Sequence, residues 1–103
     1  MKLFARTHTP KAGARWRYRV VATDQRHRKL AGRITVQIVD PLGRAHPVQY
    51  GNTKRNITRM PFRGTFSDFA QFPSDARGYR LTLRVHVSTA KGNGSLTYAI
   101  TPR

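Results

Sequence analysis

Residues 79–87, with the sequence YRLTLRVHV, decide the fold that this chain is expected to adopt. Their apolar side chains occupy every second position: Tyr79, Leu81, Leu83, Val85 and Val87. Because successive side chains of a β-strand point to opposite faces of a sheet, this period of two predicts a strand with one buried and one hydrated face. Turn-forming residues from Pro73 to Gly78 precede the stretch, so a tyrosine opens the strand at a corner, as in the core strands of β-sandwiches.

The same alternation recurs over residues 15–22, 33–39 and 96–100. With Phe66, the inward positions of these stretches complete a predicted core: Trp16, Tyr18, Val20, Ala22, Ile34, Val36, Ile38, Leu96, Tyr98 and Ile100. Short edge strands are predicted over residues 2–9 and over residues 46–50, where Pro47 interrupts the pattern. Residue 57 and residues 62–66 are interpreted as one irregular strand with Gly64 as a bulge. The phenylalanine spacing over residues 62–72 favours a helical turn or irregular crossover at 67–71, linking two sheets.

Turn-forming residues separate these strands at regular intervals. Turns are predicted at residues 24–29, 40–43 and 91–94, and a loop at 51–55. About seven short strands without a long helix indicate an all-β fold, a single antiparallel two-sheet β-sandwich. Residues 1–103 are expected to form one domain, with residues 1–9 as an edge strand or a flexible N-terminus.

Composition indicates a packed domain with an unusual surface. The 103 residues contain no cysteine, which excludes a disulfide framework, a thiolate metal site and a cysteine nucleophile. Twenty Lys and Arg against four Asp and no Glu give a formal net charge of +16, and fifteen of the cations are arginine. Such a charge attracts any polyanion and keeps copies of the chain apart, so a monomer is expected. No apolar run is long enough to span a membrane, and residues 1–13 lack the apolar segment of a secretory signal.

Two stretches resemble the immunoglobulin-like and fibronectin type III-like domains of bacterial surface and secreted proteins. Residues 24–43 look like the family's hairpin, in which an acidic turn leads through LAG (30–32) into ITVQIVD (34–40). Residues 75–87 are similar to its acidic residue, small residue and tyrosine corner ahead of an alternating strand. The resemblance covers about a third of the chain. It implies an immunoglobulin-like sandwich with a structural or adhesive task, located outside the cell or in the cell envelope.

The departures from that family pattern concern charge and the centre of the sandwich. Where such hairpins usually have glycine, a small or basic residue and proline, this chain has His27, Arg28 and Lys29. It also lacks a cysteine pair between the sheets, and Trp16 is expected to fill some of that volume. The basic turn, the missing Glu and the outward arginines fit an ordinary module to which cations were added, as in an engineered, supercharged scaffold.

The side chains available for catalysis are scattered along the chain: His8, His27, His46, His86, Asp24, Asp40, Asp68 and Asp75. Three of the four aspartates fall at predicted turns, where aspartate bonds its own backbone. No two histidines have the spacing of metal ligands, and no serine lies in a nucleophile-elbow context. We therefore expect no catalytic residues, no metal, no cofactor and no small-molecule substrate. A small hydrolase or metal enzyme has only the four histidines in its favour.

The outward cations are the candidate functional residues. They are expected to bind nucleic acid, heparin-like sugars or acidic protein surfaces by non-specific electrostatics, or merely to keep the fold soluble. The residues proposed for polyanion binding are Arg15, Arg17, Arg19, Arg28, Lys29, Arg33, Arg63, Arg80 and Arg84. Inward aromatics and the lack of a recognition helix argue against base-specific recognition. The alternative function is a natural nucleic-acid-associated protein of ribosomal or packaging type, built as a small β-barrel, which outward-facing Tyr and Phe would favour.

Overall fold

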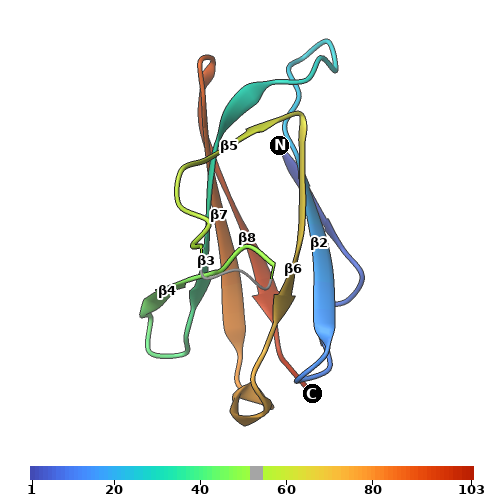
Figure 1. The fold of residues 1–103 in the computed structure, drawn as a ribbon, viewed down its shortest axis with the longest axis vertical. Helices are drawn as coiled ribbons and strands as arrows, with labels where there is room; N and C mark the ends of the chain where they lie inside the picture. The colour runs from blue at the N-terminus through green and yellow to red at the C-terminus, as the bar shows by residue number, and fades with distance from the viewer. Residues whose placement is uncertain (52–54) are drawn as a thin grey trace.

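The computed structural model describes residues 1–51 and 55–103, and it contains two packed antiparallel sheets (Figure 1). The first sheet has the order β1-β2-β6, formed by β1 (Lys2–Ala5), β2 (Arg15–Val21) and β6 (Thr65–Gln71). The second has the order β4-β3-β7-β8, with β5 also paired to β3. Its strands are β3 (Ala31–Val39), β4 (Ala45–Pro47), β5 (Met60–Arg63), β7 (Leu81–Thr89) and β8 (Gly92–Ile100). The predicted all-β, two-sheet fold is confirmed, with eight strands in the described part of the chain.

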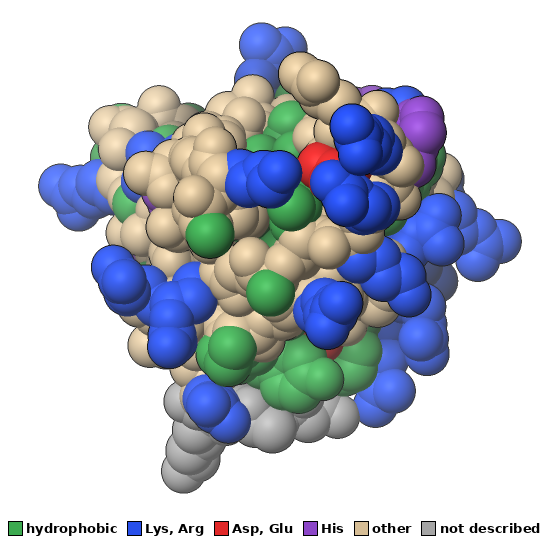
Figure 2. All heavy atoms as spheres, turned by 90° about the horizontal axis from the view of Figure 1, so that it is seen from above, with side chains coloured by type: hydrophobic (Ala, Val, Ile, Leu, Met, Phe, Trp, Pro, Cys, Tyr) green, Lys and Arg blue, Asp and Glu red, His purple; other side chains and the backbone are tan. Residues whose placement is uncertain are grey.

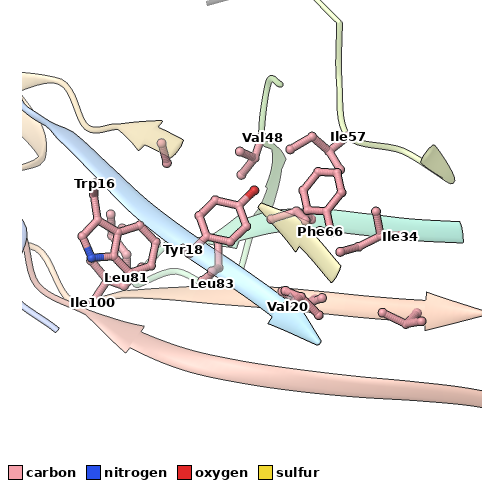
Figure 3. Close-up of a cluster of buried hydrophobic side chains, with 14 of the residues drawn as sticks. Trp16, Tyr18, Val20, Ile34, Val48, Ile57, Phe66, Leu81, Leu83 and Ile100 are labelled. Carbon is pink, nitrogen blue, oxygen red and sulfur yellow. The ribbon is translucent and has the colours of Figure 1, made fainter. Parts of the chain in front are cut away.

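Apolar side chains from both sheets meet between them (Figure 3). Along β2 the buried residues alternate strictly with exposed arginines, as predicted. Trp16 is 3% exposed, and its indole lies close to the rings of Tyr18, Phe72 and Tyr98. The indole N–H donates a hydrogen bond of 2.8 Å to the Thr7 carbonyl oxygen, so the one polar atom of this side chain is satisfied. Burial of these side chains stabilises the fold by roughly 1.5–3 kcal/mol each.

Gly64 separates two strands that the sequence pattern had joined. Residues 62–66 do not form one bulged strand, because β5 pairs with β3 in one sheet and β6 pairs with β2 in the other. Gly64 has φ of +72°, a left-handed conformation that glycine adopts without steric cost. Its N–H donates to the Leu30 carbonyl, and its own carbonyl accepts from the Ala22 N–H. The crossover between the sheets is therefore at Gly64.

The interpretation of residues 67–71 as a helical turn or crossover is wrong, because they belong to β6. The phenylalanine spacing that favoured a helix has another origin. Phe62 lies on β5, while Phe66 is buried and Phe69 lies on the opposite, outer face of β6. An odd separation on a strand places two side chains on opposite faces, so the run of rings never forms one apolar stripe.

Two further boundaries differ from the expectation. Tyr79 is 57% exposed and precedes β7, so it is neither the first inward residue nor a tyrosine corner. Its N–H closes a turn onto the Ala76 carbonyl after the 3-10 turn Ser74–Ala76, which keeps it out of the sheet ladder. The predicted turn at 91–94 is also displaced: the ladder runs to the Thr89–Gly92 pair, so Asn93 and Gly94 lie within β8.

The remaining turns and edges follow the sequence pattern. The Gly43 N–H donates to the Asp40 carbonyl at 3.0 Å, which closes the 40–43 turn. At 24–29 the turn closes with His27 at φ of +60°, the conformation that glycine usually supplies. Strands β1 and β4 are edge strands as predicted, but their bounds differ: β1 ends at Ala5 rather than at residue 9, and β4 spans Ala45–Pro47 rather than residues 46–50. The predicted loop at 51–55 falls mostly on residues 52–54, which lie outside the described residues. Within the described residues, no helix has the length and apolar character needed to cross a membrane.

Candidate polyanion-binding surfaces

The outer face of the three-stranded sheet gathers three of the predicted residues. Arg15, Arg17 and Arg19 are exposed on β2, because the alternation that buries Trp16 and its inward neighbours turns the arginines outward. Two phenylalanine rings flank these arginines, one on each neighbouring strand. The guanidinium carbon of Arg15 lies 4.6 Å from the ring centre of Phe69, and that of Arg19 lies 5.0 Å from the ring centre of Phe4. We call this surface the β2 arginine face, defined by Phe4, Arg6, Arg15, Arg17, Arg19, Ser67 and Phe69.

A shallow hollow of about 630 Å³ lies along this face. Arg17, Arg19, Arg6 and the two flanking strands contribute to its lining, and Phe4 is 47% exposed there. Asp68 also lines the hollow, and it is the one carboxylate among the described lining residues. The Gly51 N–H donates to both carboxylate oxygens of Asp68, at 3.1 and 3.2 Å. Burial raises the pKa of Asp68 above its ordinary value despite these bonds.

The neighbour of Asp68 across the ladder is Tyr18, whose hydroxyl is buried. Among the described residues this hydroxyl has no hydrogen-bond partner. Burial and, second, the negative charge of Asp68 raise the pKa of Tyr18 far above its ordinary value. The phenol therefore stays neutral, and it contributes packing to the core.

A second group of cations lies at one end of the sandwich. Arg28, Lys29, Arg63 and Lys91 surround a hollow of about 620 Å³ together with Asp24 and Leu30. Asp24 neutralises part of this charge, because its carboxylate accepts from the backbone N–H of Arg28 and Arg26 and pairs with the Arg28 guanidinium at 3.0 Å. These contacts, led by the Arg28 N–H, lower the pKa of Asp24. The group is thus less positive than its cation count suggests.

The other predicted residues are dispersed. Arg33 and Arg84 lie on the outer face of the five-stranded sheet, where each makes a local contact. The Arg33 guanidinium donates to the Arg59 carbonyl at 3.1 Å, and that of Arg84 donates to the Gln37 amide oxygen at 2.6 and 3.2 Å. Arg80 is exposed just before β7. Figure 2 looks down the long axis of Figure 1, and Lys and Arg side chains stand at the top, left and right of the outline, while hydrophobic side chains lie at its lower edge.

Sequence reasoning missed the aromatic part of the β2 arginine face. Phe69 had been assigned to a helical turn, and Phe4 had been placed in an edge strand without an assigned face. In the structure Leu3 and Ala5 are half-buried while Lys2 and Phe4 are exposed, but residues 3–5 are all apolar, so residue type alone did not mark Phe4 as outward. Lys91, which joins the end group, had been treated only as a turn residue.

The histidines occupy separate places in the structure. The His8 ring stacks on Tyr98 at 3.9 Å, His46 Nε2 lies 2.8 Å from a carboxylate oxygen of Asp40, and His86 Nδ1 lies 2.9 Å from the Ser95 hydroxyl. His27 lies in the 24–29 turn. Over residues 1–51 and 55–103, no three His, Asp, Glu or Cys side chains come together in a group that could hold a metal ion.

Comparison of this chain with models of protein families, with curated proteins and with solved structures finds no match.

Proposed function

We propose that this protein is a non-enzymatic, immunoglobulin-like module that binds polyanions through its cationic surface by electrostatics with little selectivity. The observation that carries the proposal is the net charge of +16 displayed by exposed cations on both outer sheet faces and at one end. Two of the four aspartates, Asp24 and Asp40, accept hydrogen bonds within their own turns. Little negative charge therefore remains to oppose an approaching anion.

The proposal includes an immunoglobulin-like origin with a supercharged surface. Its support is the basic turn at 27–29, where His27 adopts a positive φ at the position that the family usually gives to glycine. Cations at outward strand positions leave the buried alternation untouched, so a sandwich can acquire them without altering its core.

One observation favours the alternative, a natural nucleic-acid-associated protein, and another disfavours it. Phe4 and Tyr50 are exposed at 47% and 40%, and outward-facing aromatics favour nucleic-acid binding. The described strands form two sheets, which favours the sandwich of the first proposal over the small barrel of this alternative.

Binding to duplex DNA, structured RNA and heparin, each measured over a range of salt concentrations at constant pH, tests the proposal. We expect similar affinities for the three ligands and a steep loss of all of them with salt, because counterion release drives such binding. The absence of binding at low salt would overturn the proposal. So would a preference of about a thousandfold for one ligand that survives moderate salt, the size typical of a specific site.

A further inference from the structure

The β2 arginine face combines cations with flat apolar rings, a combination that generic charge does not require. We propose that this face binds single-stranded nucleic acid, stacking bases against Phe4, Phe69 and the guanidinium groups of Arg15 and Arg19. The inference rests on the proposed function, because charge first attracts the strand, and it deepens that function by naming the class of polyanion.

The two ring–guanidinium pairs lie on opposite sides of β2. Phe4 lies opposite Arg19 in the β1–β2 ladder, and the two side chains are in contact. Phe69 lies opposite Arg17 in the β2–β6 ladder, and its ring contacts Arg15, two residues away along β2. With strands about 4.8 Å apart and a rise of about 3.3 Å per residue, the pairs are separated by about 10 Å across the sheet and up to about 13 Å along it. Sheet faces of this kind accommodate two or three stacked bases in known RNA-binding modules.

Each cation–ring contact holds a guanidinium group against the sheet. A guanidinium group is planar, so it can stack on a base while its N–H groups donate to phosphate oxygens. Arg17 and Arg6 add charge beside the pairs, and both line the hollow that follows the face. Asp68 is the opposing charge, and its carboxylate is already engaged by the Gly51 N–H.

The chemistry of this face distinguishes single strands from other polyanions. Heparin-like sugars offer sulfate and carboxylate groups but no flat aromatic surface to the rings. Duplex DNA keeps its bases stacked inside, and its major groove is read by a protruding helix or a two-stranded ribbon rather than by a flat sheet. Unpaired bases present π-faces to any aromatic platform, with little dependence on sequence.

Three probes measured at one ionic strength isolate the stacking contribution. They are an oligothymidine of about twelve nucleotides, within the site sizes known for single-strand binders, an abasic phosphodiester oligomer of the same length, and heparin. Stacking contributes about 1–3 kcal/mol per base, so each stacked base should make the wild type bind oligothymidine about 5- to 150-fold more tightly than the abasic oligomer. Charge is matched between these two oligomers, and only the bases differ.

Charge-conserving variants locate the interaction. Arg15→Lys/Arg19→Lys should lose most of the preference for oligothymidine over the abasic oligomer, because lysine lacks the planar guanidinium group on which a base stacks. Its heparin affinity should stay within about twofold of the wild type, because lysine keeps the charge. Arg33→Lys/Arg84→Lys, on the other sheet, is the matched control and should keep the preference. Phe4→Ala should weaken oligothymidine binding about 5-fold or more, whereas Tyr79→Ala, which removes another exposed ring, should not. Thermal melts verify that each variant is folded.

The outcomes separate the two proposals. Equal affinity of the wild type for both oligomers would overturn stacking, as would equal losses in the two lysine double variants, and in either case retained heparin binding leaves the proposed function intact. Failure of the wild type to bind any of the three probes at low salt would overturn both.

Discussion

At the scale of single residues, the buried hydroxyl of Tyr18 is a source of instability. A buried polar group without a partner costs about 1–3 kcal/mol, and none of the described residues offers this hydroxyl a hydrogen bond. Tyr18→Phe should therefore raise the free energy of unfolding by about 1 kcal/mol, measured by denaturant titration. The matched control is Tyr98→Phe, at a half-buried ring on the other sheet, where little change is expected. A loss of stability in Tyr18→Phe would mean that the hydroxyl is hydrogen-bonded in solution.

Asp40 supplies a pH-dependent part of the stability. Its carboxylate accepts from the His46 side chain and from the backbone N–H of Arg44 and Leu42, and these bonds, the His46 bond first, lower its pKa below the ordinary value. Because the pKa is lowered in the folded state, ionised Asp40 makes its full contribution to the free energy of unfolding above about pH 4. That contribution is lost as the pH falls through the folded-state pKa.

Asp40→Asn tests this dependence. Asparagine keeps an oxygen for the two backbone N–H groups but cannot titrate, so the melting temperature of the variant should fall less than that of the wild type between neutral and acidic pH. Asp75→Asn removes an equal charge from an exposed position in the 3-10 turn and serves as the control. Parallel pH profiles for the wild type and Asp40→Asn would contradict the assigned role.

At the scale of secondary-structure elements, the junction of β5 and β6 depends on Gly64. An added Cβ would lie 2.7–2.9 Å from the side chain of Lys29, in a backbone conformation that disfavours side chains. Gly64→Ala should therefore destabilise the protein by more than the roughly 1 kcal/mol that a positive φ costs alanine. Gly43→Ala, at φ of +83° with nothing near the added Cβ, isolates that backbone cost. Equal unfolding free energies for the two variants would show that the Lys29 side chain moves aside freely.

The elements that the sequence predicted best are those with one buried and one exposed face. Residues 15–22 and 81–87 alternate because inward and outward positions meet opposite environments, and that contrast is visible in residue type alone. The prediction for residues 62–71 was wrong because the chain changes sheet at Gly64, so the inward and outward positions are set anew in β6. No local sequence pattern indicates which sheet a strand joins. The prediction that Tyr79 faces inward was wrong because its N–H is bonded in a turn. Tyr79 therefore lies outside the strand whose alternation its apolar side chain was expected to begin.

The candidate site was predictable in its charges and not in its rings. Arginines at outward positions on β2 follow directly from the buried phase of that strand. Whether Phe4 and Phe69 lie beside them depends on the pairing of β1 and β6 with β2, and β6 lies more than forty positions further along the chain. Such register is fixed by the three-dimensional fold, so the aromatic half of the β2 arginine face was invisible in the sequence.

At the scale of the whole molecule, the cations repel one another as well as attracting anions. A net charge of +16 on 103 residues opposes the compact state at low ionic strength. Raising the salt from about 10 mM to about 150 mM shortens the screening length from about 30 to about 8 Å, so the melting temperature should rise. Arg80→Glu should melt higher than the wild type at low salt and converge with it at high salt. A wild-type melting temperature independent of salt would contradict this repulsion.

The two sheets are tied together by backbone hydrogen bonds at both ends of the sandwich. At one end Gly64 bonds to Ala22 and Leu30, and at the other the N–H groups of Thr101 and Arg103, which follow β8, donate to the carbonyls of His8 and Pro10, which lie between β1 and β2. Fastened in this way, the layers have little freedom to part, so the outer faces of the two sheets are preformed. Encounter with a polyanion would then be governed by diffusion and electrostatic steering, without a slow rearrangement beforehand. Differences in affinity between one polyanion and another would then lie mainly in the dissociation rate of each complex.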